Sequence, residues 1–121
     1  MNFHIKKGKP PGTIIYTGKQ QNPTVITHIQ YSEQKVMIHE TLKPFSDQYI
    51  DWVSVEGLAD TERIKRLCLD LEVDNLIIED IFNINQRNKF EMLPNYFFSS
   101  IRFYYLDSDN RVDTDYISIL L

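Results

Sequence analysis

The chain has few of the residues that build covalent cross-links, phosphate-binding loops and membrane spans. Its single cysteine, Cys68, excludes an intrachain disulfide and a cysteine-based zinc site. Such low cysteine usage suits a reducing, cytoplasmic compartment. The four glycines are scattered and none directly opens an expected helix, which argues against a glycine-rich phosphate loop. The longest apolar runs fall far short of the roughly 20 residues that span a bilayer.

Positive charge is also scarce, with 13 Lys and Arg against 17 Asp and Glu and a net charge of −4. This balance argues against nucleic acid as a partner, because phosphate binding needs a basic face. The one basic cluster, Lys6, Lys7 and Lys9, lies in what we interpret as a flexible tail over residues 1–9. No apolar segment follows these lysines, so we expect no signal peptide in this stretch. We expect one domain over residues 10–121, because the length suits a single core.

Hydrophobic periodicity predicts seven strands and two helices. Runs of β-branched and aromatic residues between Gly, Pro and polar turns predict strands, and apolar residues that recur every three or four positions predict helices. The expected strands cover residues 13–17, 24–30, 35–40, 52–55, 90–93, 96–106 and 116–121. Residues 96–106 are apolar on both faces, which favours a central strand covered on both sides. Because the chain stops inside the last strand, we expect a truncated domain.

The first helix is expected over residues 60–72. Asp60 is the expected N-cap, because its carboxylate can accept hydrogen bonds from backbone amides of the first turn. Behind it, Ile64, Leu67, Cys68 and Leu71 fall on one helical stripe, which predicts the buried face. Cys68 is therefore interpreted as a core thiol and not as a nucleophile.

The second helix is expected over residues 74–83, with Asp74 as its cap. Its apolar residues share one face: Ile77, Ile78, Ile81 and Phe82. Glu79, Asp80 and Asn83 point the other way. Adjacent outward carboxylates are usually a solvated helix face, and this interpretation stays open beside a functional one.

The remaining candidate sites have simpler interpretations. His4, His28 and His39 lack metal-like spacing and are interpreted as strand and tail histidines. The acidic segment over residues 107–115 lacks the glycine and the final glutamate of a calcium loop, so we interpret it as a hairpin turn. The aromatic residues between 96 and 105 lack a basic surround and are assigned to core packing. No set of residues combines a nucleophile, a base and oxyanion donors, so we expect no enzyme.

Four short stretches together resemble the N-terminal cytoplasmic domain of the CorA family of magnesium and cobalt transporters. They are Pro-Pro-Gly-Thr at 10–13, Trp-Val-Ser-Val-Glu-Gly-Leu at 52–58, Glu-Asp-Ile-Phe-Asn at 79–83 and Gln-Arg-Asn-Lys-Phe-Glu at 86–91. Their order and separation match the family pattern from about residue 10 to the end. Asn88 departs from the proline usual there, and Phe82 departs from a leucine.

The resemblance implies an α+β fold, an α/β/α sandwich around a mixed sheet, truncated here at its C-terminal side. It also implies a homopentamer in the cell inner membrane, with this domain in the cytoplasm. The family's stalk, two membrane helices and Gly-Met-Asn signature are absent here, so we expect that this chain cannot itself conduct ions. In the family, the pair matching Glu79 and Asp80 helps to form divalent-cation sensing sites between subunits.

The physical chemistry of Mg²⁺ is compatible with such a role. Mg²⁺ keeps several waters and commonly uses only one or two carboxylates. Because adjacent helix residues diverge by about 100°, Glu79 and Asp80 need another subunit to close a site. We therefore expect Mg²⁺, with Co²⁺ as the alternative, as a regulatory ion that does not bind this chain tightly by itself. The alternative is a stand-alone interaction module that uses an exposed sheet edge.

Overall fold

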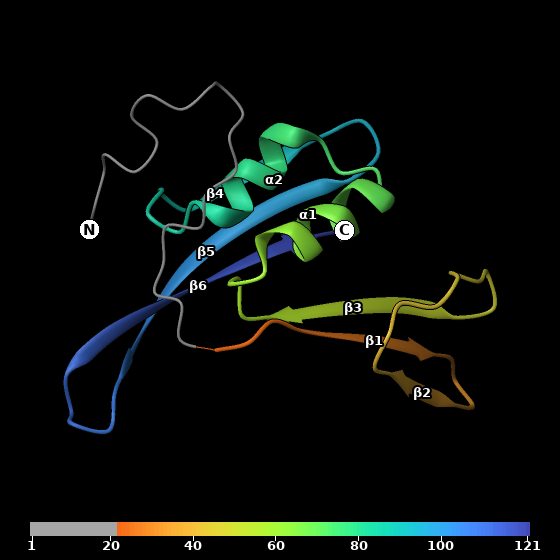
Figure 1. The fold of residues 1–121 in the computed structure, drawn as a ribbon, viewed down its shortest axis with the longest axis horizontal. Helices are drawn as coiled ribbons and strands as arrows, with labels where there is room; N and C mark the ends of the chain where they lie inside the picture. The colour runs from red at the N-terminus through yellow and green to blue at the C-terminus, as the bar shows by residue number, and fades with distance from the viewer. Residues whose placement is uncertain (1–21) are drawn as a thin grey trace. The chain divides into compact units, whose positions relative to one another are not determined.

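The structure, a computed structural model, describes residues 22–121, which form six strands and two helices (Figure 1). In chain order these are β1 (Val25–Tyr31), β2 (Val36–His39), β3 (Ile50–Glu56), α1 (Thr61–Asp70), α2 (Asn75–Phe82), β4 (Lys89–Met92), β5 (Phe97–Leu106) and β6 (Val112–Leu120). The predicted tail over residues 1–9 and the predicted strand over residues 13–17 lie outside the described residues. All other predicted elements are present, with ends shifted by a few residues.

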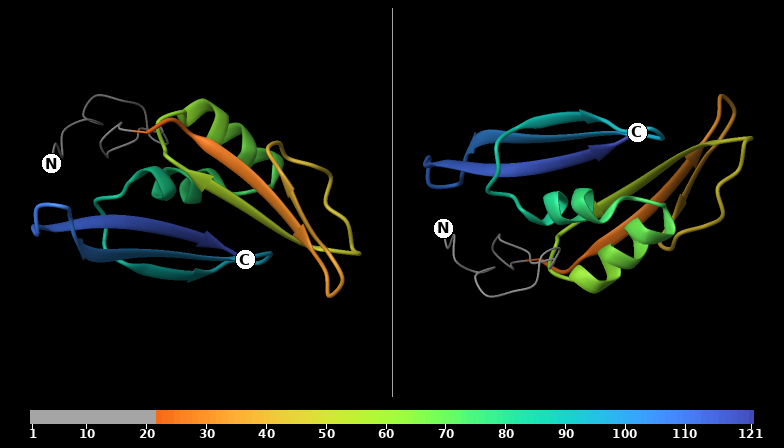
Figure 2. Two further views of the ribbon diagram at one scale, coloured as in Figure 1. Left: turned by 90° about the horizontal axis from the view of Figure 1, so that it is seen from below. Right: turned by 90° about the horizontal axis from the view of Figure 1, so that it is seen from above.

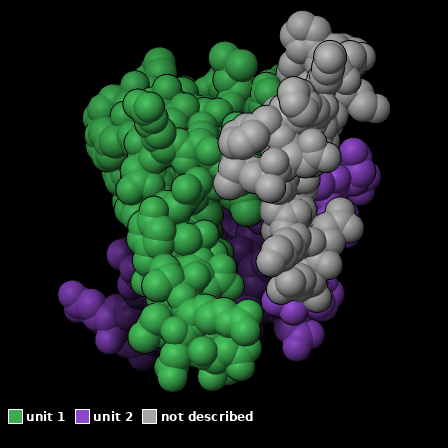
Figure 3. Space-filling model, turned by 90° about the vertical axis from the view of Figure 1, so that its left-hand side faces the viewer, with its two compact units in different colours: residues 1–18, 68–121 green, residues 19–67 purple. Residues whose placement is uncertain are grey.

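The chain divides into two compact units, one of residues 19–67 and the other of residues 1–18 and 68–121 (Figure 3). The boundary falls inside α1. The first unit therefore contains β1, β2, β3 and most of α1, whereas the second contains α2 and the last three strands.

The first unit is built on an antiparallel sheet with the order β2-β1-β3. A tight turn joins β1 to β2, in which the Ser32 N–H donates to the Lys35 carbonyl at 2.9 Å. The period-2 alternation of β1 buries Ile26 and His28 on one face. The register sets His28 opposite His39 on β2 and opposite Val53 on β3.

The start and the stripe of α1 confirm most of the prediction for this helix. The Arg63 N–H donates to Asp60 Oδ1 at 3.1 Å, so Asp60 is the N-cap. Ile64, Leu67 and Cys68 are buried. Burial raises the pKa of the Cys68 thiol to about 11, which suits a core thiol.

The prediction was wrong for Leu71, which is 37% exposed, because the helix ends at Asp70. Glu72 adopts a left-handed conformation with φ 59° and its N–H donates to the Leu69 carbonyl. The Val73 N–H reaches back to the Cys68 carbonyl at 2.9 Å, which is the pattern of a Schellman cap. After this reversal Val73 is buried, whereas Leu71 is not.

The second unit is built on an antiparallel sheet with the order β4-β5-β6. On one side of this sheet lies α2 (Figure 2), and its four predicted core residues, Ile77, Ile78, Ile81 and Phe82, are buried. On β5, Phe98 and Ser100 are fully buried. The hairpin loop before β6 is shorter than predicted, because pairing with β5 extends back to Val112 in spite of the polar residues there.

β5 is the central strand of its sheet, as predicted, but it is not covered on both sides along its length. Ile101 and Phe103 are 42% and 43% exposed, and Tyr104, Tyr105 and Leu106 are exposed as well. The assignment of the aromatic cluster to the core was therefore wrong for its C-terminal half. An eight-residue helix is about 12 Å long, whereas a ten-residue strand extends about 33 Å, so α2 is too short to cover β5.

The α+β class is confirmed, with two helices and two three-stranded sheets. Within residues 22–121 every strand pairing is antiparallel, whereas we expected one mixed sheet. For three of the four pairings the reason lies in the connections over residues 32–35, 93–96 and 107–111. They are too short for the crossover of a dozen or more residues that parallel strands require. Neither helix of the described segment is long and apolar enough to cross a membrane.

Candidate functional site

The predicted ligand Asp80 lies in the last turn of α2, where it forms an ion pair with Lys89. The Lys89 Nζ atom is 2.5 Å from Asp80 Oδ2, and the two side chains are 29% and 23% exposed. The same Nζ atom lies 3.6 Å from Glu91 Oε1 and 5.9 Å from the centroid of the Phe98 ring. Asp80 is therefore a partly buried carboxylate that already has a cationic partner.

The ion pair perturbs the titration of Lys89. The hydrogen bond to Asp80 raises the pKa of the Lys89 ammonium above its ordinary value, against the opposing effect of partial desolvation. The carboxylate of Glu91 acts in the same direction. Lys89 is consequently charged throughout the physiological pH range, and the negative charge of Asp80 is balanced within the chain.

The predicted division of α2 into two faces is confirmed. Glu79, Asp80 and Asn83 remain partly exposed, whereas the apolar face is buried. The helix ends where the Asn83 N–H donates to the carbonyls of Glu79 and Asp80, at 3.1 and 3.2 Å. The Asp80 carbonyl also accepts a hydrogen bond from the Gln86 side chain at 2.7 Å. The backbone of Asp80 is thus held at the same time as its carboxylate.

The segment before β4 positions Lys89 and is held by residues of β5 and β6. The Arg102 guanidinium donates to the carbonyls of Ile84 and Gln86, at 3.1 and 3.4 Å. The Tyr116 hydroxyl donates to the Arg87 carbonyl at 3.3 Å. Because this loop is not paired with a strand, these side chains provide the hydrogen-bond donors for its carbonyl groups.

Asn88, at the position where the resemblance implies a proline, takes part in this arrangement. Its Oδ1 atom accepts a hydrogen bond from the backbone N–H of Arg102 at 2.7 Å. This bond lies next to the β4–β5 pairing, which begins at Lys89 opposite Ser100. A proline has no side-chain acceptor for that bond, so the departure from the family pattern has a local structural role.

The residues of α2 supply some, but not all, of the oxygen ligands that a Mg²⁺ site needs. Glu79 and Asp80 offer two carboxylates, which is the number that Mg²⁺ commonly takes from a protein. No group of three or more His, Cys, Asp or Glu side chains is arranged to hold a metal ion within the described segment. Further ligands are therefore needed, and the role of these two residues as ligands stays a prediction.

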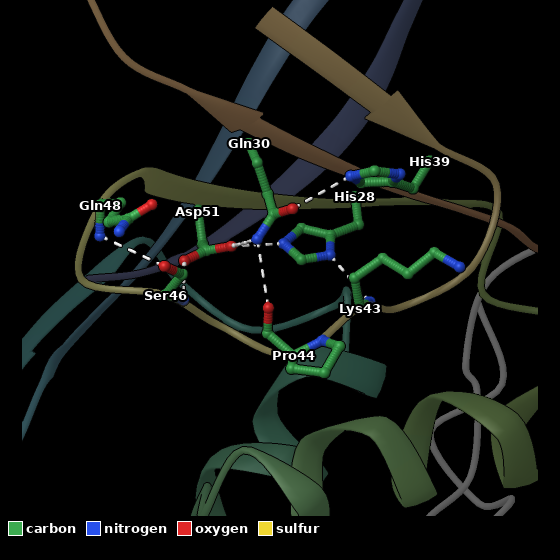
Figure 4. A network of polar contacts seen from close by, with 8 residues as sticks. All are labelled: His28, Gln30, His39, Lys43, Pro44, Ser46, Gln48 and Asp51. Atoms are coloured by element: carbon green, nitrogen blue, oxygen red, sulfur yellow. Dashed lines mark hydrogen bonds and ion pairs between the residues drawn. The ribbon is translucent and has the colours of Figure 1, made fainter.

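Sequence reasoning missed a polar network in the other unit, which joins His28, Gln30, His39 and Asp51 (Figure 4). His28 Nε2 lies 2.7 Å from Asp51 Oδ1, which also accepts a hydrogen bond from Gln30 Nε2 at 2.9 Å. His39 Nε2 bonds to Gln30 Oε1 at 3.0 Å. The His28 side chain is fully buried, whereas the Asp51 side chain is 11% exposed.

The network determines which ring nitrogen of His28 donates a hydrogen bond and which accepts one. The Lys43 N–H donates to His28 Nδ1 at 3.0 Å, so Nδ1 must be the acceptor and Nε2 carries the proton donated to Asp51. Desolvation acts to raise the pKa of the Asp51 carboxyl, but hydrogen bonds from Gln30 and His28 outweigh it and hold this pKa below its ordinary value of 3.8.

This arrangement fastens the loop over residues 43–46 to the sheet. Besides the Lys43 amide, the Pro44 carbonyl accepts a bond from Gln30 at 3.2 Å, and the Ser46 N–H lies 3.5 Å from Asp51 Oδ2. Both ring nitrogens of His28 are occupied, so neither is available to a substrate as a general base. The interpretation of His28 as a structural histidine therefore fits the geometry.

The sequence held one usable signal for this network. Alternation on β1 sets His28 and Gln30 on the same face, two residues apart. The partner Asp51 is 23 residues away from His28 and joins them only through the β1–β3 register. That register could not be deduced from the pattern of β1.

A comparison with known proteins supports the resemblance. The chain is 32% identical over 123 residues to the protein named "Cobalt/magnesium transport protein CorA" from Thermotoga maritima. The similarity covers 96% of this chain but 35% of that protein, so the chain spans about a third of the length of its relative. No protein-family model matches the chain. The predicted resemblance to the CorA family is confirmed.

Proposed function

We propose that this CorA-like chain is the divalent-cation-sensing, regulatory part of a longer magnesium or cobalt transporter. In this proposal it lies on the cytoplasmic side of the cell inner membrane, and the pore belongs to segments outside residues 1–121. The proposal rests on the 32% identity over nearly the whole chain. It also rests on Asp80, a partly buried carboxylate in the segment that carries the resemblance, which is held in place by a charged partner.

The proposed sensing site lies between subunits of a homo-oligomer, a pentamer in the family that the chain resembles. Glu79 and Asp80 supply carboxylates from one subunit, and a neighbouring subunit supplies the remaining ligands. Loss of the ion removes the ligand bonds that join the two subunits, which favours their separation. Ion binding and subunit arrangement are then reciprocally linked, as a feedback sensor requires.

Limited proteolysis of the full-length protein over a range of Mg²⁺ concentrations tests the proposal. Mg²⁺ is expected to protect the wild type, and Asp80→Asn is expected to need several-fold more Mg²⁺ for half-protection. Asp109→Asn is the matched control, because Asp109 lies in the exposed turn before β6. If both variants follow the wild type and Asp80→Asn is folded, the carboxylate of Asp80 does not sense the ion.

The alternative is an interaction module that uses a sheet edge. β6 is nine residues long and, among the described strands, pairs only with β5, so its outer edge can accept a further strand. The gene sequence beyond Leu121 separates the two functions. Two apolar helices near its end support the transporter, whereas a stop codon directly after Leu121 supports the module.

A further inference from the structure

We propose that Lys89 is a tethered counter-ion of Asp80, which a divalent cation must displace before it binds this carboxylate. The inference rests on the proposed cation-sensing function, and adds that the Lys89 ammonium competes with the divalent cation for the Asp80 carboxylate. Lys89 then sets the concentration of divalent cation at which the site fills.

The contact between the two side chains makes their pairing and ion binding mutually exclusive. The Lys89 Nζ atom already lies 2.5 Å from Asp80 Oδ2. Mg²⁺ binds carboxylate oxygens at about 2.0–2.1 Å, so both cations on one carboxylate would lie within a few ångströms of each other. Their repulsion is only partly screened, because both side chains are more than two-thirds buried.

The displaced ammonium has a second position available on the same face of the sheet. Glu91 is two residues beyond Lys89 on β4, so both side chains point to the same side, and its Oε1 atom is already 3.6 Å from Nζ. Ser100 is the direct partner of Lys89 in the β4–β5 register and is fully buried. Its Oγ atom has no hydrogen-bond partner within the part of the chain that the structure describes.

The tether also gives selectivity for charge. Because Lys89 belongs to the same chain, its effective concentration at Asp80 is of millimolar order or higher. A monovalent cation carries the same charge as the ammonium and gains nothing by replacing it, whereas a divalent cation gains about twice the Coulomb energy. Lys89 thereby keeps the abundant monovalent cations away from the sensing carboxylate.

The experiment measures the Mg²⁺ concentration for half-protection of the full-length protein in Lys89→Met, which keeps the apolar stem near the Phe98 ring. The expected result is a concentration about two- to fivefold lower than for the wild type, the range for losing one ion pair. K⁺ at high concentration should then protect Lys89→Met more than it protects the wild type. Lys43→Met is the control, because it removes one positive charge from the other unit.

Glu91→Gln provides a second, independent readout. It removes the alternative partner of the ammonium, so it should raise the half-protective concentration in the wild-type background. In the Lys89→Met background it should have no effect, because no ammonium remains to be moved. An equal effect of Glu91→Gln in both backgrounds would show ordinary long-range electrostatics and would overturn the inference.

The outcomes separate the inference from the function on which it rests. If Asp80→Asn raises the half-protective concentration but Lys89→Met leaves it unchanged or raises it, the sensing site stands and the counter-ion role is wrong. If Asp80→Asn has no effect, the sensing function itself fails, and the inference fails with it. Thermal denaturation of each variant of the 121-residue chain reports whether it is folded.

Discussion

The buried network around Asp51 predicts a strong and pH-dependent effect of changing this residue. Asp51→Ala leaves the Nε2–H of His28 and one Nε2–H of Gln30 without their acceptor. Each buried donor without a partner costs about 1–3 kcal/mol, so the loss of two acceptor contacts should lower the free energy of unfolding by about 2–6 kcal/mol at pH 7. Urea denaturation of the 121-residue chain measures this value.

Asp51→Asn should be milder, for a reason visible in Figure 4. Both short hydrogen bonds converge on the same oxygen, Asp51 Oδ1. An asparagine carbonyl in that position keeps both as neutral bonds, and only the longer contact with the Ser46 N–H is lost. The expected loss is about 0.5–2 kcal/mol. A larger loss for Asn than for Ala would contradict the geometry of the network.

The difference between wild type and Asp51→Asn should depend on pH. Because the pKa of Asp51 is lower in the folded state, its ionisation stabilises the fold fully above about pH 3.8. That stabilisation is lost as the pH falls through the lower pKa of the folded state, so the two stabilities should converge there. A difference that stays constant from pH 7 to pH 2, or a loss below about 0.5 kcal/mol for Asp51→Ala, would refute the reasoning.

Two further predictions concern the core and the isolated chain. Leu67→Ala should lower the free energy of unfolding by about 2–5 kcal/mol, because Leu67 is only 8% exposed. Leu69 is 47% exposed, so Leu69→Ala should lower the free energy of unfolding by well under half as much. Comparable losses in urea denaturation would contradict the assigned face of α1. Mg²⁺ at a few millimolar should barely change the melting temperature of the 121-residue chain, because its described residues hold no complete metal site. Thermal denaturation measures this temperature. A large, saturable stabilisation by Mg²⁺ would show that the site needs no second subunit.

The helices were the most predictable part of the fold. The apolar faces of α1 and α2 follow from a 3.6-residue period, and Asp60 marks the start of α1 through a bond three residues along the chain. Leu71 was misplaced because the reversal after Asp70 depends on Glu72 in a left-handed conformation. Glutamate gives no warning of this conformation, since glycine is the residue that usually adopts it.

For the candidate site, the sequence by itself determined that Glu79 and Asp80 lie opposite the apolar face of α2, and that their segment resembles a known family. Only the tertiary structure decided that Asp80 carries an internal counter-ion, because Lys89 is nine residues away, beyond a loop held by Arg102 and Asn88. Likewise, the pairing of His28 with Asp51 depends on strand register across 23 residues. Local periodicity determines which face a side chain occupies, whereas its partner is set by loops and registers that bring distant segments together.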